Sequence, residues 1–146
     1  MPTIVPNEEY CIGCRLCEIA CMVEHSGCSD VFKALRPGRP RPCPGTVVEV
    51  EGDRALSISC RHCDHPPCVL ACLTGAMHRS PEGRVVVDRK RCAGCWTCVL
   101  VCPFGAVAKG PDRKVASKCD FCPGRDRPAC VEACPNRALR VVEGTA

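Results

Sequence analysis

One short stretch of the chain carries four cysteines at a spacing suited to a metal cluster. Cys92, Cys95 and Cys98 are separated by two residues each, and Cys102 follows after three more, with Pro103 beside it. Three thiolates this close together can surround one corner of a compact iron–sulfur cluster, while the fourth reaches a neighbouring cluster. A single zinc ion usually takes its four ligands from two separated cysteine pairs. The spacing therefore favours iron–sulfur chemistry over zinc.

The same arrangement occurs four times along the chain. Each group holds four cysteines and ends in a C-x-x-x-C step, although the internal gaps widen in the second and fourth groups. Repetition of this pattern predicts several clusters in one small protein. We expect sixteen cysteines to be cluster ligands: Cys11, Cys14, Cys17, Cys21, Cys60, Cys63, Cys68, Cys72, Cys92, Cys95, Cys98, Cys102, Cys119, Cys122, Cys130 and Cys134.

Two of the eighteen cysteines, Cys28 and Cys43, have no place in these groups. We interpret them as free buried thiols, since a cysteine without a partner behaves as a small hydrophobic residue. An exchangeable ligand or a redox-active pair is the alternative.

The composition offers little material for a conventional core. Aromatic residues make up 3% of the 146 residues, and the chain holds 14 prolines and 12 glycines. Metal binding can replace side-chain packing as the source of stability, because the free energy of ligation becomes free energy of folding. We therefore predict that the protein without iron is largely unfolded.

A disulfide scaffold is the alternative use of so many cysteines. Residues 1–10 have neither the charged start nor the apolar run of a secretion signal. No stretch reaches the apolar length of a membrane span. We expect a cytoplasmic protein without direct membrane insertion.

The charge pattern argues against a nucleic-acid partner, and the motif content argues against catalysis. The formal net charge is +4, but four thiolates around an oxidised cluster leave about −2 per site, so the basic residues offset buried negative charge. No basic run with interleaved aromatic residues is present, and we expect no nucleic-acid partner. The chain also lacks a G-x-G-x-x-G sequence, a phosphate loop and a nucleophile–base pair, so we expect a non-catalytic protein.

Between the cysteine groups, the sequence predicts short strands and short helices. Strands are expected at 3–5, 46–50, 55–59, 76–79, 84–87, 106–109, 114–116 and 138–142, and helices at about 16–25, 67–73, 97–101 and 128–133. The stretch 36–45 holds four prolines and three arginines and has no periodicity. We interpret it as a surface linker, with a docking surface for a partner as the alternative.

The four groups resemble the four-cluster polyferredoxin subunits of large anaerobic oxidoreductases. This superfamily includes electron-transfer subunits of dimethyl sulfoxide reductase and formate dehydrogenase, and the similarity covers residues 4–142. The runs Glu24-His25-Ser26 and Leu73-Thr74-Gly75-Ala76-Met77 look most like the iron–sulfur partner of carbon monoxide dehydrogenase and the small subunit of tungsten aldehyde oxidoreductase. Many members have proline after the last cysteine of a group, whereas Met22 and Leu73 stand there in this chain.

The resemblance implies an α+β fold of two nested bacterial-ferredoxin-like modules, made of short hairpins and short helices around four 4Fe-4S clusters. It assigns residues 1–27 and 111–146 to an outer module, 28–45 to a Pro/Arg-rich linker and 46–110 to an inner module. It also implies pairing of strand 3–5 with 138–142. The implied ligand sets are Cys92, Cys95, Cys98 with Cys72; Cys60, Cys63, Cys68 with Cys102; Cys11, Cys14, Cys17 with Cys134; and Cys119, Cys122, Cys130 with Cys21.

Three other residues are expected beside the clusters. Trp96 directly follows Cys95, Phe104 follows Cys102-Pro103, and both would pack over a cluster and exclude water. Lys118 precedes a ligand and would offset cluster charge. The four histidines are expected at the surface or next to ligands, not as ligands.

These observations together predict an electron-transfer subunit. Its partner would be a catalytic oxidoreductase subunit with a tungsten or molybdenum pterin or a nickel–iron site, with a flavoprotein or a ferredoxin as a second electron partner. A freestanding soluble polyferredoxin that shuttles between enzymes is the main alternative. An iron–sulfur sensor and self-association into longer conductors are weaker ones.

Overall fold

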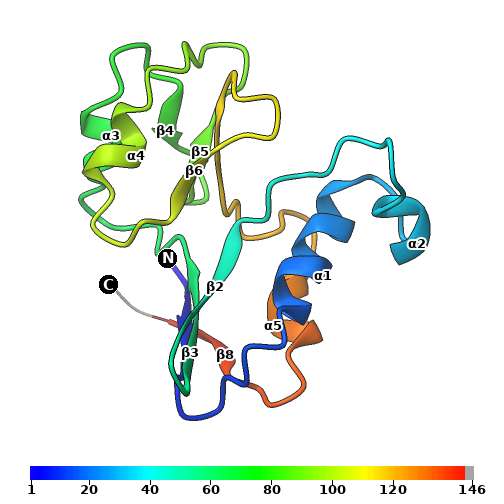
Figure 1. The fold of residues 1–146 in the computed structure, drawn as a ribbon. Helices are drawn as coiled ribbons and strands as arrows, with labels where there is room; N and C mark the ends of the chain where they lie inside the picture. The colour runs from blue at the N-terminus through cyan, green and yellow to red at the C-terminus, as the bar shows by residue number, and fades with distance from the viewer. Residues whose placement is uncertain (144–146) are drawn as a thin grey trace.

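The computed structural model describes residues 1–143 and contains four two-stranded antiparallel sheets and five short helices there (Figure 1). In chain order the elements are β1 (Thr3–Pro6), α1 (Leu16–His25), α2 (Val31–Ala34), β2 (Thr46–Glu51), β3 (Arg54–Ser59), α3 (Pro67–Leu70), β4 (Met77–Arg79), β5 (Val85–Val87), α4 (Thr97–Val101), β6 (Val107–Lys109), β7 (Ala116–Lys118), α5 (Ala129–Ala133) and β8 (Leu139–Val142).

Three of the sheets are local hairpins, and the fourth joins the two ends of the chain. β2 pairs with β3, β4 with β5 and β6 with β7, as the alternation of valine-rich runs and turn residues predicts. β1 pairs with β8, with Thr3 opposite Val142. This confirms the expected pairing of 3–5 with 138–142.

The helices begin and end where the sequence requires it. Arg15 and Trp96, which precede α1 and α4, both adopt left-handed backbone conformations, with φ of 61° and 63°. Pro103 and Pro135 disfavour helical geometry in the residue before them, so Cys102 and Cys134 are extended and end α4 and α5. No proline follows Cys21, and α1 therefore continues for four more residues.

Two separate groups of buried side chains form the core. The first joins α1, α5 and the β1–β8 sheet with the β2–β3 hairpin, which contributes Val48 and Ala55. The second joins α3 and α4 with the other two hairpins, and Met77, Val85 and Val107 are its main aliphatic members. Cysteines belong to both groups. The division into an outer and an inner module stays a prediction.

The structure differs from the sequence prediction in three places. α2 was not expected; it forms because the Asp30 side chain accepts a hydrogen bond from the Lys33 N–H at 2.9 Å, which caps its first turn. α3 is three residues shorter than predicted and is followed by a turn in which the Gly75 N–H donates to the Cys72 carbonyl. β7 lies two residues later than predicted, after the turn of residues 110–115. No helix among residues 1–143 is long and apolar enough to cross a membrane.

Candidate metal centres

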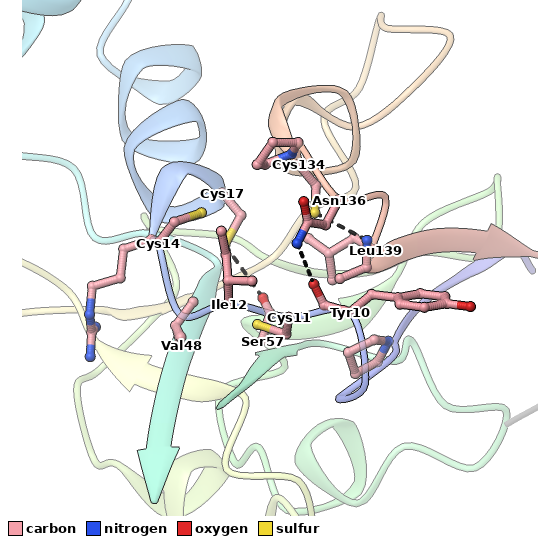
Figure 2. A pocket seen from close by; sticks show the side chains of 14 residues that line it. Tyr10, Cys11, Ile12, Cys14, Cys17, Val48, Ser57, Cys134, Asn136 and Leu139 are labelled. Carbon is pink, nitrogen blue, oxygen red and sulfur yellow. Dashed lines mark hydrogen bonds between the residues drawn. The ribbon is translucent and has the colours of Figure 1, made fainter. Parts of the chain in front are cut away.

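The first candidate centre is a hollow between α1, α5 and the loop before α1. Figure 2 shows four cysteines around it: Cys11, Cys14, Cys17 and Cys134. Three of them come from one loop and the first turn of α1, and the fourth comes from the end of α5, far along the chain. Apart from the cysteines, the lining of this hollow is mainly apolar. These four residues form one of the sets that the resemblance implies.

The second candidate centre has the same construction in the other half of the molecule. Its cysteines are Cys72, Cys92, Cys95 and Cys98. Three again come from one loop and the start of a helix, here α4, while Cys72 comes from the segment after α3. α3 and α4 pack against each other, which brings this fourth cysteine into place.

The cysteines of the other two implied sets affect one another's pKa values. Burial, together with the charges of Cys60 and Cys102, raises the pKa of the Cys68 thiol to about 11. Burial, together with the charges of Cys21 and Cys122, raises the pKa of the Cys130 thiol to about 12. Cys102 and Cys21 thus each affect a thiol of another sequence group, which agrees with the exchange that the resemblance implies. The two hollows bring together two of the implied sets, and these effects support the other two.

A repeated turn directs backbone N–H groups at the last sulfur of three groups. After Cys72, Cys102 and Cys134, the N–H three residues later donates to the cysteine carbonyl at 3.2 Å. An N–H one or two residues further on then donates to the sulfur itself: Met77 to Cys72 at 3.3 Å, Ala106 to Cys102 at 3.4 Å and Ala138 to Cys134 at 3.2 Å. Such bonds stabilise a thiolate and tune the potential of a bound cluster.

Cys21 lacks this turn because α1 continues past it. Its sulfur instead accepts a hydrogen bond from the Gly45 N–H at 3.2 Å, from a residue 24 positions later. Gly45 packs so closely that a Cβ there would lie 2.6 Å from the Cys119 Cα. The end of the linker therefore supplies the donor that the missing turn supplies in the other groups.

The donor set fits iron–sulfur clusters and does not fit the alternatives. All eighteen cysteines are free thiols, so the disulfide scaffold is not formed. Among residues 1–143, no three His, Cys, Asp or Glu side chains converge closely enough to hold a single metal ion. Four cysteines around a hollow, with N–H donors directed at sulfur, are what a cubane cluster requires, since each thiolate binds a different iron.

Comparisons with known proteins agree with this geometry. Residues 54–144 match the family model described as a 4Fe-4S dicluster domain. An iron–sulfur protein of Rhodospirillum rubrum is 40% identical, with 96% of this chain and 81% of that protein covered. The thiosulfate reductase electron transfer subunit PhsB of Salmonella typhi is 39% identical, over 92% of this chain and 71% of its own length.

The chain belongs to the 4Fe-4S dicluster family. As a member of this family it is an iron–sulfur protein that carries 4Fe-4S clusters. Its fold is similar to a chain in the active site complex BamBC of benzoyl coenzyme A reductase with 1,5-dienoyl-CoA bound, with a TM-score of 0.53, 20% identity and coverage of 100% of this chain and 78% of that one. The relatives include electron-transfer subunits of reductases, among them PhsB.

Two residues expected beside clusters lie close to cysteines of this dicluster protein. Trp96 lines the second hollow, and the Lys109 ammonium lies 5.2 Å from the centre of its ring. Lys118 donates hydrogen bonds to the carbonyls of Val85 and Cys119. Its charge also opposes the rise in the pKa of the Cys119 thiol, which is caused first by burial. Phe104 is 37% exposed and stacks under the Arg61 guanidinium at 4.7 Å, so part of its ring faces solvent.

His62 is a buried residue whose role the sequence does not reveal. Its side chain is 2% exposed, and its Nδ1 accepts the Val85 N–H at 3.0 Å. Burial, aided by the charge of Lys118, lowers the pKa of the imidazole to about 3, so the ring is neutral. Its Nε2 has no protein hydrogen-bond partner among the described residues. The signal for it in the sequence is the run C-R-H-C, which places a histidine between two expected ligands.

Charge effects between buried thiols also join cysteines of different implied sets. The charge of Cys17 raises the pKa of Cys130, which links the first hollow to the set around Cys21. The charge of Cys60 raises the pKa of Cys119, which links that set to the one around Cys102. Cys63 and Cys68 of that set are followed along the chain by Cys72, which lines the second hollow. The two exposed cysteines, Cys14 and Cys95, each line one of the two hollows.

Proposed function

We propose that this chain is an electron-transfer subunit with four 4Fe-4S clusters. It relays electrons to or from the catalytic subunit of a larger oxidoreductase. The observation that carries the proposal is the pair of hollows in the two halves of the molecule, each lined by four cysteines of which one is exposed to solvent. A row of one-electron carriers open at both ends suits transfer between two partners.

The proposed ligands are the sixteen cysteines of the four groups, in the four sets given above. Two hollows, each lined by four cysteines that the resemblance groups together, support the end sets. The mutual effects of buried thiols on their pKa values support the two middle sets.

The protein's own residues would hold the clusters and set their surroundings. Each bound cluster supplies one-electron redox chemistry. The backbone N–H groups of Gly45, Met77, Ala106 and Ala138 donate to ligand sulfurs and disperse their negative charge. Trp96 covers one side of the second hollow and keeps water from it. No substrate pocket or acid–base pair is needed for this role.

An exposed apolar surface favours a bound subunit over a freestanding carrier. Leu70 at the end of α3, Leu73 just after it and Leu100 in the adjoining α4 are 83%, 92% and 84% exposed. Permanent partners commonly cover apolar side chains of this kind. α3 and α4 lie side by side in Figure 1, and they flank the end set that contains Cys95.

The partner's class is a further part of the proposal. PhsB is a subunit of thiosulfate reductase, and another relative is a chain of anaerobic dimethyl sulfoxide reductase from Haemophilus influenzae. We propose a catalytic subunit of the tungsten or molybdenum pterin type, with the nickel–iron type of carbon monoxide dehydrogenase as the second candidate because of the runs 24–26 and 73–77. A flavoprotein or ferredoxin would serve the other end, and we expect a cytoplasmic complex.

The test is purification of the tagged native chain without oxygen. We expect about sixteen iron atoms and sixteen sulfides per chain, and an oxidoreductase subunit recovered in fixed ratio and identified by mass spectrometry. A chain that emerges alone with filled clusters is a freestanding polyferredoxin. About eight irons per chain would contradict the four-cluster assignment.

A further inference from the structure

We propose that residues 26–45, which contain the linker and are called the arm, are a docking element. The partner surface that binds the arm is acidic and has an apolar pocket. The partner that carries this surface is the oxidoreductase subunit, so the inference rests on the proposed function and extends it. In Figure 1 the arm runs outward beyond α1, with α2 at its outer edge, before returning to β2.

The arm is held at both ends and does not hang loosely from the protein. At its start, the Arg39 side chain donates to the Ser26 carbonyl at 3.0 Å, and the Cys28 N–H donates to the Ser26 hydroxyl. At its end, the Gly45 N–H donates to the Cys21 sulfur. Prolines at 37, 40, 42 and 44 restrict the backbone between these points. A surface restricted in this way loses little entropy when it binds.

The middle of the arm presents an aromatic side chain to solvent. Ala34 of α2 is fully buried, at 0% exposure, and fixes one face of this short helix against the protein. By contrast, Phe32 is 88% exposed and its neighbour Val31 is 44% exposed. The other two phenylalanines of the chain are far less exposed, since Phe104 lies at 37% and Phe121 packs on His62. A rigidly held exposed aromatic side chain is a typical anchor for a pocket on a partner.

The arm also carries unbalanced positive charge around this side chain. Lys33, Arg36, Arg39 and Arg41 are exposed, and Asp30, the one carboxylate, caps α2; the arm therefore has a net charge of +3. Within residues 1–143, none of the four cations forms an ion pair. Charge complementarity therefore specifies an acidic partner surface.

The position of the arm favours a redox protein over a lipid or nucleic-acid surface. The arm begins at the end of α1, the helix that contains Cys21. It ends at Gly45, whose N–H donates to the Cys21 sulfur. α2 is only four residues long and too short for the amphipathic helix that binds membranes. A single aromatic residue gives no platform for stacked bases. A partner that binds the arm would instead be seated beside a proposed cluster.

The experiment compares two charge-reversal variants of the tagged native chain, purified without oxygen. The arm variant combines Lys33→Glu, Arg36→Glu and Arg41→Glu; Arg39 is left intact because it holds the arm in place. The control variant combines Arg54→Glu, Lys114→Glu and Arg127→Glu, three exposed cations elsewhere that form no ion pair among residues 1–143. Both change the net charge equally, and iron content checks that each folds.

We expect the arm variant to retain about tenfold less of the oxidoreductase subunit than the control variant does, at about 0.15 M salt. Phe32→Ser should weaken retention on its own. In the wild-type complex, a zero-length carbodiimide should join the Lys33 amine to Asp or Glu residues of that subunit.

Three results would overturn the proposal. Equal retention by all variants, without a cross-link from Lys33, would remove the arm's role and leave the proposed function intact. Recovery of no oxidoreductase subunit, even with the wild-type chain, would overturn both. Binding of the wild-type chain to anionic phosphatidylserine vesicles or to duplex DNA, lost in the arm variant alone, would assign the arm to a lipid or nucleic-acid surface instead.

Discussion

At the scale of single residues, Gly45 is a position where the backbone of a cysteine leaves no room for a side chain. Its N–H is the donor to the Cys21 sulfur, and its Cα faces the Cys119 backbone. A Cβ there would lie 2.6 Å from the Cys119 Cα and 2.8 Å from the Cys119 N, and backbone atoms cannot move aside as a flexible side chain can.

We predict that Gly45→Ala displaces Cys21 or Cys119 and removes one cluster, which is about a quarter of the iron. Iron and sulfide analysis of the anaerobically purified protein measures this. The matched control is Gly27→Ala, at the other end of the arm, where nothing lies within 4 Å of the added Cβ and only the left-handed backbone costs about 1–2 kcal/mol. Full iron content in Gly45→Ala would show that the contact is dispensable.

His62 gives a second prediction at this scale. His62→Ala leaves the Val85 N–H without its acceptor in the protein interior, and a buried unsatisfied donor costs about 1–3 kcal/mol. We expect a lower guanidinium midpoint for cluster loss, followed by the visible absorbance of the iron–sulfur protein. The control is His65→Ala, which removes an exposed histidine from the same loop. Similar midpoints for the two variants would contradict a structural role for the buried ring.

At the scale of elements, the sequence predicts whatever depends on local chemistry. The bounds of α1 and α4 follow from the cysteine spacing, and the β2–β3 hairpin follows from two valine- and alanine-containing strands around a Gly-Asp turn. The single helical turn α2 in the exposed linker is not predictable from the sequence, because it depends on one capping aspartate in a stretch without periodicity. The partners of Gly45 and His62 lie 24 and 23 residues away, and no local pattern encodes such contacts.

The cysteine sets show the same limit. Spacing predicts which cysteines are ligands, but the exchange of the last cysteine between groups came from family resemblance. In the structure, α1 packs against α5 and α3 packs against α4, which brings Cys134 and Cys72 to the two hollows. These contacts join segments that are far apart in sequence, so they follow from the whole fold and not from any one group.

The residue after the last cysteine decides how an element ends, and this gives a prediction at the element scale. Proline at 22 would match the third and fourth groups in sequence but would break the interior of α1. We expect Met22→Pro to destabilise the protein by about 3 kcal/mol or more. It should also release the contact between His25 Nε2 and Asp120 Oδ1, which lie 3.1 Å apart. Cluster retention in guanidinium measures the effect.

Leu73→Pro is the matched control for that change. Leu73 follows the end of α3 in a turn and has no backbone hydrogen bond from its N–H among residues 1–143. Proline should therefore be tolerated there, with nearly wild-type iron content and midpoint. Equal damage from both substitutions would mean that α1 does not need to extend past Cys21.

At the scale of the whole molecule, cysteines occupy the places that aliphatic side chains fill in other proteins. Cys17, Cys60, Cys119 and Cys130 belong to the first buried group, and Cys68 and Cys98 belong to the second. Sheets of two strands are marginal in water by themselves. Each hairpin therefore depends on the cysteine-rich centre against which it packs.

Removal of iron should then unfold the molecule as a whole. Without iron, each hollow leaves four thiols facing empty space, and the aliphatic remainder of the second core is little more than Met77, Val85 and Val107 with their neighbours. Since binding energy is folding energy in such a protein, we expect loss of amide protection in β4–β7 together with loss of far-ultraviolet circular dichroism after chelation. Hydrogen exchange under reducing, oxygen-free conditions measures this and keeps disulfides from replacing the metal. A protected, cooperatively melting apo-protein would mean that side-chain packing suffices and that the clusters are guests in a preformed fold.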